Sequence, residues 1–332
     1  MKKKAVSILV NLFKVGFAAG IITWLIRSGA IDLSVFKLFL SPEKILISLF
    51  GIFFTFILAT ERWRKLLSVQ NIHSTFHNCF QLTTMGMFFN YVVPGGVGGD
   101  VVKAFYIIKE SPHQKMGAGV SVLLDRVLGL YAMMIMCCTF ILLDWARVST
   151  NQELKIIAQI LFLLFFGFTL ALILAFSKKF KNLGWQEFLL KPQFNKLEKV
   201  IKKLLSAFDA VHAYGSSLKV VAEVIVLSLL AQISSIFVFV YLGNVSGFDV
   251  PWLAYFFVVP LGFMVTAVPI SPAGVGVGQM AFYFLFNMYL NEKSQVGPTL
   301  ITIFQILNFI MSLLGAFYFI RRRTTITTGA SN

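Results

Sequence analysis

The chain has 332 residues, of which 58% are hydrophobic and only 13% are charged, and its mean hydropathy is +0.81. Soluble domains carry about 25% charged residues, so this composition excludes an ordinary soluble globular domain. The formal net charge is +15, but the basic residues lie between apolar runs. That pattern is typical of topogenic charge and of contact with anionic headgroups, and we expect no nucleic-acid partner.

Apolar runs close to the length of a membrane span recur along the whole chain. A helix needs about 20 apolar residues to cross the hydrocarbon core, and in lipid the backbone must satisfy its own hydrogen bonds. The runs are continuous rather than alternating, which favours helices over barrel strands. The expected segments are 5–26, 43–60, 78–93, 117–143, 154–177, 218–243, 251–270, 274–290 and 298–320. The predicted fold class is all-α: one polytopic membrane domain over residues 1–332, with about six full spans and two broken hairpins.

Clusters of Lys and Arg predict the orientation of these segments. The basic stretches are Lys2–Lys4, Arg62 to Lys65, the lysine-rich segment 178–219 and Arg321–Arg323. By the positive-inside rule all four are cytoplasmic, which places both termini in the cytoplasm and the protein in the cytoplasmic (inner) membrane. Segment 178–217 has the apolar spacing of a basic amphipathic helix, and we expect it to lie on the membrane surface.

This orientation requires two hairpins that return to the side from which they enter. Residues 78–108 return on the cytoplasmic side and residues 251–290 on the outer side, and each hairpin breaks at a Pro/Gly segment, 94–100 or 269–278. The pattern is typical of an inverted repeat, with halves 43–143 and 218–320 and a site between the breaks. The alternative is that the breaks are ordinary turns between complete spans. The arms of the first hairpin are short for a crossing, which favours re-entrance; those of the second are about 18 residues long, which leaves both interpretations open.

The breaks also supply helix N-termini, whose unpaired N–H groups favour anions. We expect Asp100 to cap a helix that starts at Val101, and Ser271 to act as an N-cap before Pro272. The residues expected to form the two breaks and the helix starts after them are Pro94, Gly95, Gly96, Gly98, Gly99, Asp100, Ser271, Pro272, Gly274, Gly276 and Gln279.

Charged residues near the cytoplasmic ends of apolar runs are the candidates for contact with a lipid headgroup. Asp125 and Arg126 lie several residues inside such a run, where charge is costly and usually faces a partner or a cavity. Arg126 is the candidate phosphate ligand, and Asp125 the group that orients Lys103 or Arg62. The alternative is an interfacial pair that reaches water. The candidate set is Arg62, Arg64, Lys103, Asp125 and Arg126; the two arginines that flank Trp63 are equally well explained as interfacial anchors.

Four motifs in order carry a family resemblance: Glu61–Leu67, Pro94–Lys103, Leu124–Gly129 and Ile270–Gly276. The set resembles the transmembrane domain of the lysylphosphatidylglycerol synthase/flippase family. The resemblance implies movement of a lipid or lipid-linked molecule between leaflets. The synthases append a soluble aminoacyl-transfer domain, and since this chain ends soon after its last apolar run, we do not expect aminoacylation. Relatives often have an acidic residue where this chain has Gln279.

We therefore expect a flippase or translocase for an anionic phospholipid or a lipid-linked molecule, with membrane lipids as partners. The alternatives are a membrane-embedded glycosyl- or headgroup transferase and, less favoured, an assembly or regulatory protein. The sequence has no D-x-D pair and no phosphate-binding G-x-x-x-x-G-K-[ST] loop, so a transporter is favoured over an enzyme. We expect no cofactor, and no metal at His73 and His77, which lack a third ligand. A homo-oligomer stays open.

Overall fold

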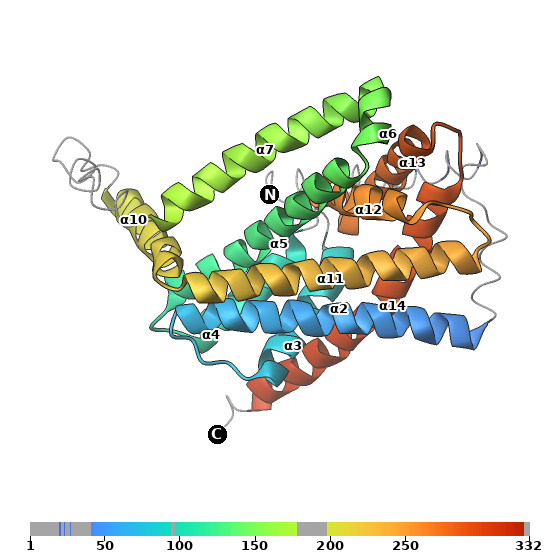
Figure 1. The fold of residues 1–332 in the computed structure, drawn as a ribbon. Helices are drawn as coiled ribbons and strands as arrows, with labels where there is room; N and C mark the ends of the chain where they lie inside the picture. Colours follow the sequence, from blue (N-terminus) through green and yellow to red (C-terminus); the bar gives the residue numbers. More distant parts are fainter. Residues whose placement is uncertain are drawn as a thin grey trace.

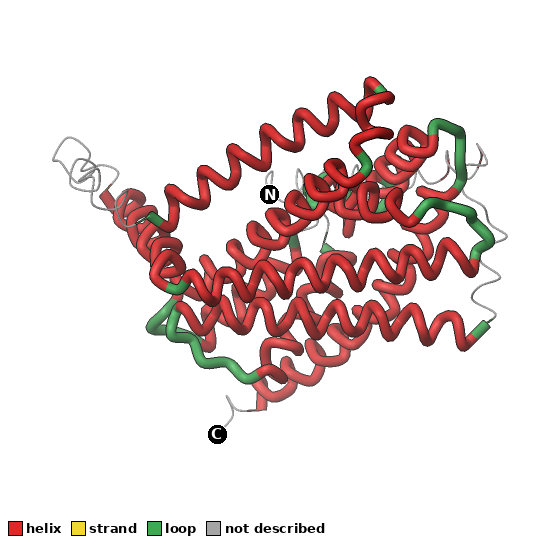
Figure 2. Tube along the Cα trace, viewed as in Figure 1, coloured by secondary structure: helices red, strands yellow, loops and turns green. Residues whose placement is uncertain are grey.

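The computed structural model describes residues 41–93, 97–177 and 198–328, together with Gly20, Thr23 and Arg27. Every regular element in these residues is helical (Figures 1 and 2). In chain order they are α2 (Pro42–Val69), α3 (Phe76–Val92), α4 (Gly98–Glu110), α5 (Lys115–Leu143), α6 (Trp145–Thr150), α7 (Gln152–Phe176), α10 (Glu198–His212), η3 (Ala213–Ser216), α11 (Leu218–Val245), α12 (Trp252–Thr266), η4 (Pro272–Gly274), α13 (Val277–Leu290) and α14 (Val296–Thr328).

Five of these helices are long and apolar enough to cross a membrane: α2, α5, α7, α11 and α14. They contain five of the six spans expected from the sequence, and the expected first span, 5–26, falls almost entirely outside the described residues. The prediction of an all-α polytopic membrane protein is confirmed. The long helices run roughly along one direction, with α2 and α11 side by side (Figure 1).

The two broken hairpins consist of short helices. Helices α3 and α4 have 17 and 13 residues, and α12 and α13 have 15 and 14. At 1.5 Å per residue they are between about 20 and 26 Å long, shorter than a hydrocarbon core of about 30 Å. The expected length of the second pair was wrong. Helix α12 ends at Thr266. The prolines at 269 and 272 cannot donate a backbone hydrogen bond, and no α-helix resumes until α13 begins at Val277.

The hairpins enter from opposite ends of the helix bundle. The start of α3 lies beside the end of α14, where Arg322 donates to Asn78 at 2.9 Å. The start of α12 lies beside the end of α5, where the rings of Trp252 and Phe140 have centroids 6.2 Å apart. The inner ends meet, because α3 contacts η4. Each hairpin also packs against a long helix of the other half, α3 against α14 and α12 against α5.

The basic loops gather at one end of the bundle. Lys65 of α2 pairs with Glu223 of α11 at 2.6 Å, and Gln70 donates to the carbonyl of Ala210 in α10 at 2.7 Å. At the opposite end Arg147 donates to the carbonyl of Tyr289 at 3.2 Å. The described parts of the basic stretches expected to be cytoplasmic therefore share one end of the bundle, and Arg147 lies at the other. Lys2–Lys4 lie outside the described residues. Residues 178–197 of the amphipathic segment lie outside the described residues.

Tyr214 holds the remaining part of the amphipathic segment against the bundle. Its side chain is fully buried, and its hydroxyl donates to the carbonyl of Leu66 at 2.9 Å. Burial raises the pKa of this hydroxyl, so it stays protonated and keeps its donor role. Helix α10, whose Lys202, Lys203 and Leu204 are exposed, is therefore fixed beside α5 and α7.

We predict that Gly99→Ala destabilises the protein while Gly119→Ala does not. A β-carbon on Gly99 would overlap the carbonyl oxygen of Gly86 and lie 2.6 Å from Asn90 Oδ1, whereas one on Gly119 meets nothing closer than 3.8 Å. Forced overpacking costs about 1–3 kcal/mol, and alanine is the better helix former at the open position. Thermal unfolding in detergent measures both variants. Equal melting temperatures for the two variants would show that the close packing of α4 against α3 at Gly99 does not contribute to stability.

We also predict that the basic end faces the cytoplasm. Single cysteines at Ser216 and Lys293, which are exposed at opposite ends, report the orientation, since the native Cys79, Cys137 and Cys138 are buried. A membrane-impermeant thiol reagent added to intact cells should label position 293 and leave position 216 unlabelled until the membrane is opened. The reverse pattern would overturn the orientation.

Candidate functional site

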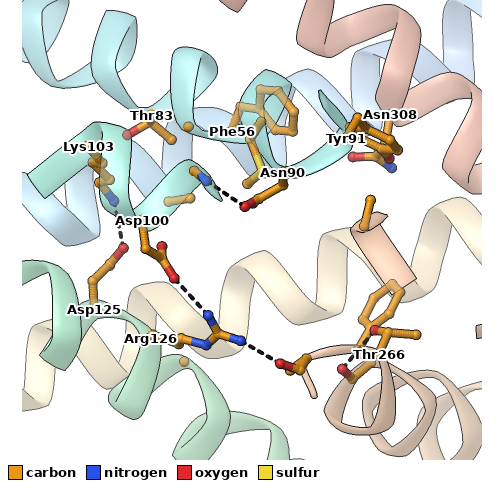
Figure 3. Close-up of a pocket in the computed structure, with 18 of the residues that line it drawn as sticks. Phe56, Thr83, Asn90, Tyr91, Asp100, Lys103, Asp125, Arg126, Thr266 and Asn308 are labelled. Carbon is orange, nitrogen blue, oxygen red and sulfur yellow. Dashed lines mark hydrogen bonds and ion pairs between the residues drawn. The ribbon is translucent and has the colours of Figure 1, made fainter. Parts of the chain in front are cut away.

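A cavity of about 390 Å³ lies where the two breaks meet (Figure 3). Helices α2, α3, α4, α5, α12 and α14 and the turn η4 contribute to its wall. The wall combines charged groups, aromatic rings such as Phe56 and Phe304, and neutral polar groups. The polar lining consists of Arg62, Thr83, Asn90, Tyr91, Asp100, Lys103, Asp125, Arg126, Thr266, Gln305 and Asn308.

Asp125 is buried between two cations. Its Oδ1 accepts a hydrogen bond from Arg62 Nε at 2.7 Å, and its Oδ2 accepts one from Lys103 Nζ at 2.8 Å. The side chain of Asp125 is only 10% exposed and that of Lys103 8%. A charge so far from water is tolerated only when it is paired and hydrogen-bonded. The sequence suggested that Asp125 orients Lys103 or Arg62, and the structure places it against both.

Lys103 is further held by an aromatic ring. Its Nζ lies 4.0 Å from the centroid of the Trp63 ring, and the indole N–H of Trp63 donates to Ser121 Oγ at 3.2 Å. A cation over an indole face is attracted by the ring quadrupole, more strongly when both are shielded from water. Trp63 is fully buried, so it packs inside the protein beneath Lys103 and is not an interfacial anchor.

Arg126 links the two breaks. Its Nη1 pairs with Asp100 Oδ2 at 2.8 Å, and its Nη2 donates to the carbonyl oxygen of Ala267 (Figure 3). Asp100 belongs to the first turn after the first break, and Ala267 follows the last residue of α12. This pair is more open than the Asp125 cluster, with side chains 27% and 38% exposed for Arg126 and Asp100.

The expected capping role of Asp100 is wrong. Helix α4 begins at Gly98, three residues before the expected start, with Val97 at the N-cap position. Asp100 is therefore the third residue of the helix, where a carboxylate is favourable to the helix dipole but is used for the pair with Arg126. Asn90 takes over part of the capping, because its Oδ1 accepts from the Gly99 N–H at 2.9 Å.

The second break depends on three residues with positive φ. Ala273 has φ 47°, and Gly274 and Gly276 have φ 71° and 85°, a region that only glycine enters without cost. Ser271 stands before Pro272 at the start of η4, as expected, but it makes no capping bond, and its buried Oγ has no partner among the described residues.

Gln279 binds the end of this break to α14. Its Oε1 accepts from the Gly276 N–H at 2.7 Å, and its Nε2 donates to Gln305 Oε1 at 2.8 Å and to Thr302 Oγ1 at 3.1 Å. Gln305 Nε2 in turn donates to the carbonyl of Ala273 at 3.3 Å. This neutral network occupies the position where the family resemblance leads one to expect an acidic side chain.

Not every residue of the candidate set reaches the cavity. Arg64 is outside the lining and is 42% exposed, with Glu61 as its ionic partner at 2.7 Å. Pro94, Gly95 and Gly96 are outside the described residues. Among the residues that the structure does describe, no group of three His, Cys, Asp or Glu side chains is placed to hold a metal ion.

Several groups of the cavity wall were not predicted from the sequence. Tyr91, whose hydroxyl donates to the backbone carbonyl of Gln305 at 3.1 Å, joins the first hairpin to the last long helix. Thr83 lines the cavity with a buried hydroxyl that has no partner among the described residues. The backbone carbonyls of Ala267 and Ala273 act as acceptors. Their roles depend on where the helices end, and the residue types alone do not predict those ends.

The fold and the cavity together define an all-α polytopic membrane protein with a polar chamber between two broken hairpins. A comparison with protein families matches residues 11–315 to the family described as "Lysylphosphatidylglycerol synthase TM region". The chain belongs to this family, which confirms the resemblance seen in its motifs and indicates a membrane protein that acts on lipids. Comparisons with curated proteins and with solved structures gave no significant match.

We predict that Asp125→Ala strongly destabilises the protein. The substitution leaves two poorly exposed cations, Arg62 and Lys103, without their counter-ion, and removal of one partner of a buried pair costs about 3–5 kcal/mol. The double variant Asp125→Ala/Lys103→Met should recover part of the loss. The matched control is Glu223→Gln at the more exposed pair with Lys65, whose side chains are 37% and 32% exposed, and where a smaller effect is expected. Thermal unfolding in detergent measures all three; similar melting temperatures for Asp125→Ala and the control would contradict the prediction.

Proposed function

We propose that the protein moves an anionic phospholipid or a lipid-linked molecule between the leaflets of the cytoplasmic membrane. The observation that carries this proposal is the position of Arg126, which lies in the cavity with its guanidinium between the two breaks. A lipid phosphate loses its hydration on the way through a bilayer, and a guanidinium offers it two parallel charge-assisted hydrogen bonds.

The charge of the cavity suits an anion. Its wall contains the basic side chains of Arg62, Lys103 and Arg126 and the acidic side chains of Asp100 and Asp125, so bases exceed acids by one. In a poorly hydrated chamber such an imbalance favours a ligand of opposite sign. The volume, about 390 Å³, is within the range of small-molecule sites and is large enough for a headgroup while the lipid tails stay outside.

The arrangement of the helices supports a transport mechanism based on an inverted repeat. Helices α2 to α5 and α11 to α14 have the same order of a long helix, a broken hairpin and a long helix, and the hairpins enter from opposite ends. In such folds the binding site lies at the breaks, and movement of one half against the other exposes it to each side in turn. Because their helices are shorter than a membrane core, we take both hairpins to be re-entrant.

We predict that Arg126→Ala weakens the interaction with an anionic headgroup by about 10- to 100-fold, the equivalent of one charge-assisted hydrogen bond. Arg126→Lys should recover only part of this, because an ammonium cannot reproduce the bidentate geometry. The measurement is the rate at which purified protein, reconstituted in vesicles, moves a fluorescent phosphatidylglycerol between leaflets at a mole fraction well below saturation. Arg64→Ala is the matched control, since it removes the same side chain from a position outside the cavity.

Two results would contradict the proposal. If Arg126→Ala inserts normally and moves the lipid at the wild-type rate, Arg126 is not a headgroup ligand. If the wild-type protein moves no lipid but chromatography shows that the labelled lipid has been chemically modified, the protein is a transferase.

A further inference from the structure

The two breaks share a sequence pattern. The first contains Pro94-Gly-Gly-Val-Gly98 and the second Pro272-Ala-Gly-Val-Gly276, so the five-residue stretches differ only at their second position. Each is followed by a short helix, α4 or α13, that starts within one residue of the last glycine. Asp100 is the sixth residue after Pro94 and Gln279 the seventh after Pro272. We therefore align the two breaks by the start of the helix that follows each, α4 or α13.

The third residue of each short helix makes the equivalent contact. In the first half this residue is Asp100, which binds Arg126 of the following long helix α5 at 2.8 Å. In the second half it is Gln279, which binds Gln305 of the following long helix α14, also at 2.8 Å. Both partners also bond to the opposite half: the Arg126 side chain donates to the carbonyl of Ala267, and the backbone carbonyl of Gln305 accepts from the Tyr91 hydroxyl. One position is thus filled by an ion pair in one half and by a pair of amides in the other.

The surroundings explain the difference in charge. Gln279 is 1% exposed and Gln305 8%, whereas the side chains of Asp100 and Arg126 are 38% and 27% exposed. If an ion pair were as deeply buried as the two glutamines, the free-energy cost of removing both charges from water would nearly cancel the attraction between them. Neutral amides can be buried there because every bond is made within the network.

The two pairs also differ in what an anion can do to them. Asp100 and Arg126 are open enough for a phosphate to take the place of the carboxylate on the guanidinium. The amide pair is closed: the Gln279 side chain already binds the Gly276 N–H, Thr302 and Gln305, and Gln305 already binds the carbonyl of Ala273. The amides fix both ends of the turn that follows Ser271, and this turn is continuous with the segment that presents the Ala267 carbonyl to Arg126.

We propose that Gln279 and Gln305 are positioning residues: they are the neutral counterpart of the Asp100–Arg126 pair, and they hold the second break in place while a headgroup anion exchanges with Asp100 at Arg126. This inference rests on the proposed lipid translocation and assigns unequal tasks to the two halves. Binding strength is set by Arg126, and the rate at which bound lipid passes depends on the second break being held.

The test separates binding from passage. Reconstituted protein is assayed with increasing mole fractions of fluorescent phosphatidylglycerol in phosphatidylcholine vesicles. Gln279→Leu, and Gln305→Met as a second variant should the first fail to fold, should lower the maximal rate about tenfold, as expected for the loss of buried hydrogen bonds, with the half-saturating mole fraction unchanged. Asp100→Asn/Arg126→Gln, which gives the first break a neutral pair like the second, should raise the half-saturating mole fraction about tenfold or more. Gln279→Glu, which has the same shape and keeps the acceptor for the Gly276 N–H, should recover part of the maximal rate.

A distance measurement keeps the inference testable if the proposed function fails. Spin labels on cysteines at Val101 and Val268, both exposed and next to the two breaks, report their separation without any lipid movement. The distance distribution should broaden in Gln279→Leu and stay narrow in Asp100→Asn, which leaves the bond from Arg126 to the carbonyl of Ala267 in place. An unchanged distribution in Gln279→Leu, or a half-saturating mole fraction that rises as it does in the first-break variant, would overturn the inference. If wild-type protein moves no lipid while the distributions behave as expected, the proposed function fails and the positioning role stands.

Discussion

The cost of charge away from water is the constraint on which this structure depends. Asp125 lies within a membrane-spanning helix, and its carboxylate has both oxygens occupied, one by Arg62 and the other by Lys103. These cations come from two other helices, α2 and α4, so the carboxylate holds a long helix and a hairpin helix against α5. Lys103 also makes a cation–π contact with the Trp63 ring. Removing Asp125, Arg62 or Lys103 from the cluster would leave a buried charge without its partner. The cluster is therefore a fixed element of the cavity.

Broken helices raise a second problem, which side chains solve. Each break leaves N–H and C=O groups without a helical partner, and in the interior of a membrane protein they must be satisfied by other groups. Asn90 accepts from Gly99 N–H, Gln279 accepts from Gly276 N–H, and Arg126 donates to the carbonyl of Ala267. Two of the three side chains come from the hairpin of the same half. The third is charged and comes from the opposite half, so the second break is the point where the halves depend on each other.

The sequence predicted much of the architecture because hydropathy and charge act over whole segments. The spans, the two breaks and the gathering of the basic loops at one end follow from runs of many residues, and single substitutions barely change them. The charged members of the cavity were also predictable, since Asp125 and Arg126 in an apolar run require partners.

The details at the breaks were not predictable. Asp100 was expected to cap a helix, but the helix begins at Gly98, because glycine lets α4 approach α3 closely enough for Asn90 to reach the Gly99 N–H. The length of the second hairpin depended on where α12 stops before Pro269. Arg64 has the same sequence neighbourhood as Arg62, and only the direction of the helix face separates them: one lines the cavity and the other pairs with Glu61 outside it.

The difference between the two acidic residues of the cavity has a consequence for its chemistry. Asp125 is saturated by two cations and is nearly inaccessible, whereas Asp100 shares a single cation and is over a third exposed. An incoming anion that displaced Asp125 would leave a carboxylate buried and unpaired. One that displaced Asp100 would leave it partly exposed in the first turn of α4, where the helix dipole still favours its charge. Exchange at Arg126 is therefore the less costly of the two, and the chamber combines a rigid ionic cluster with one ionic contact that can open.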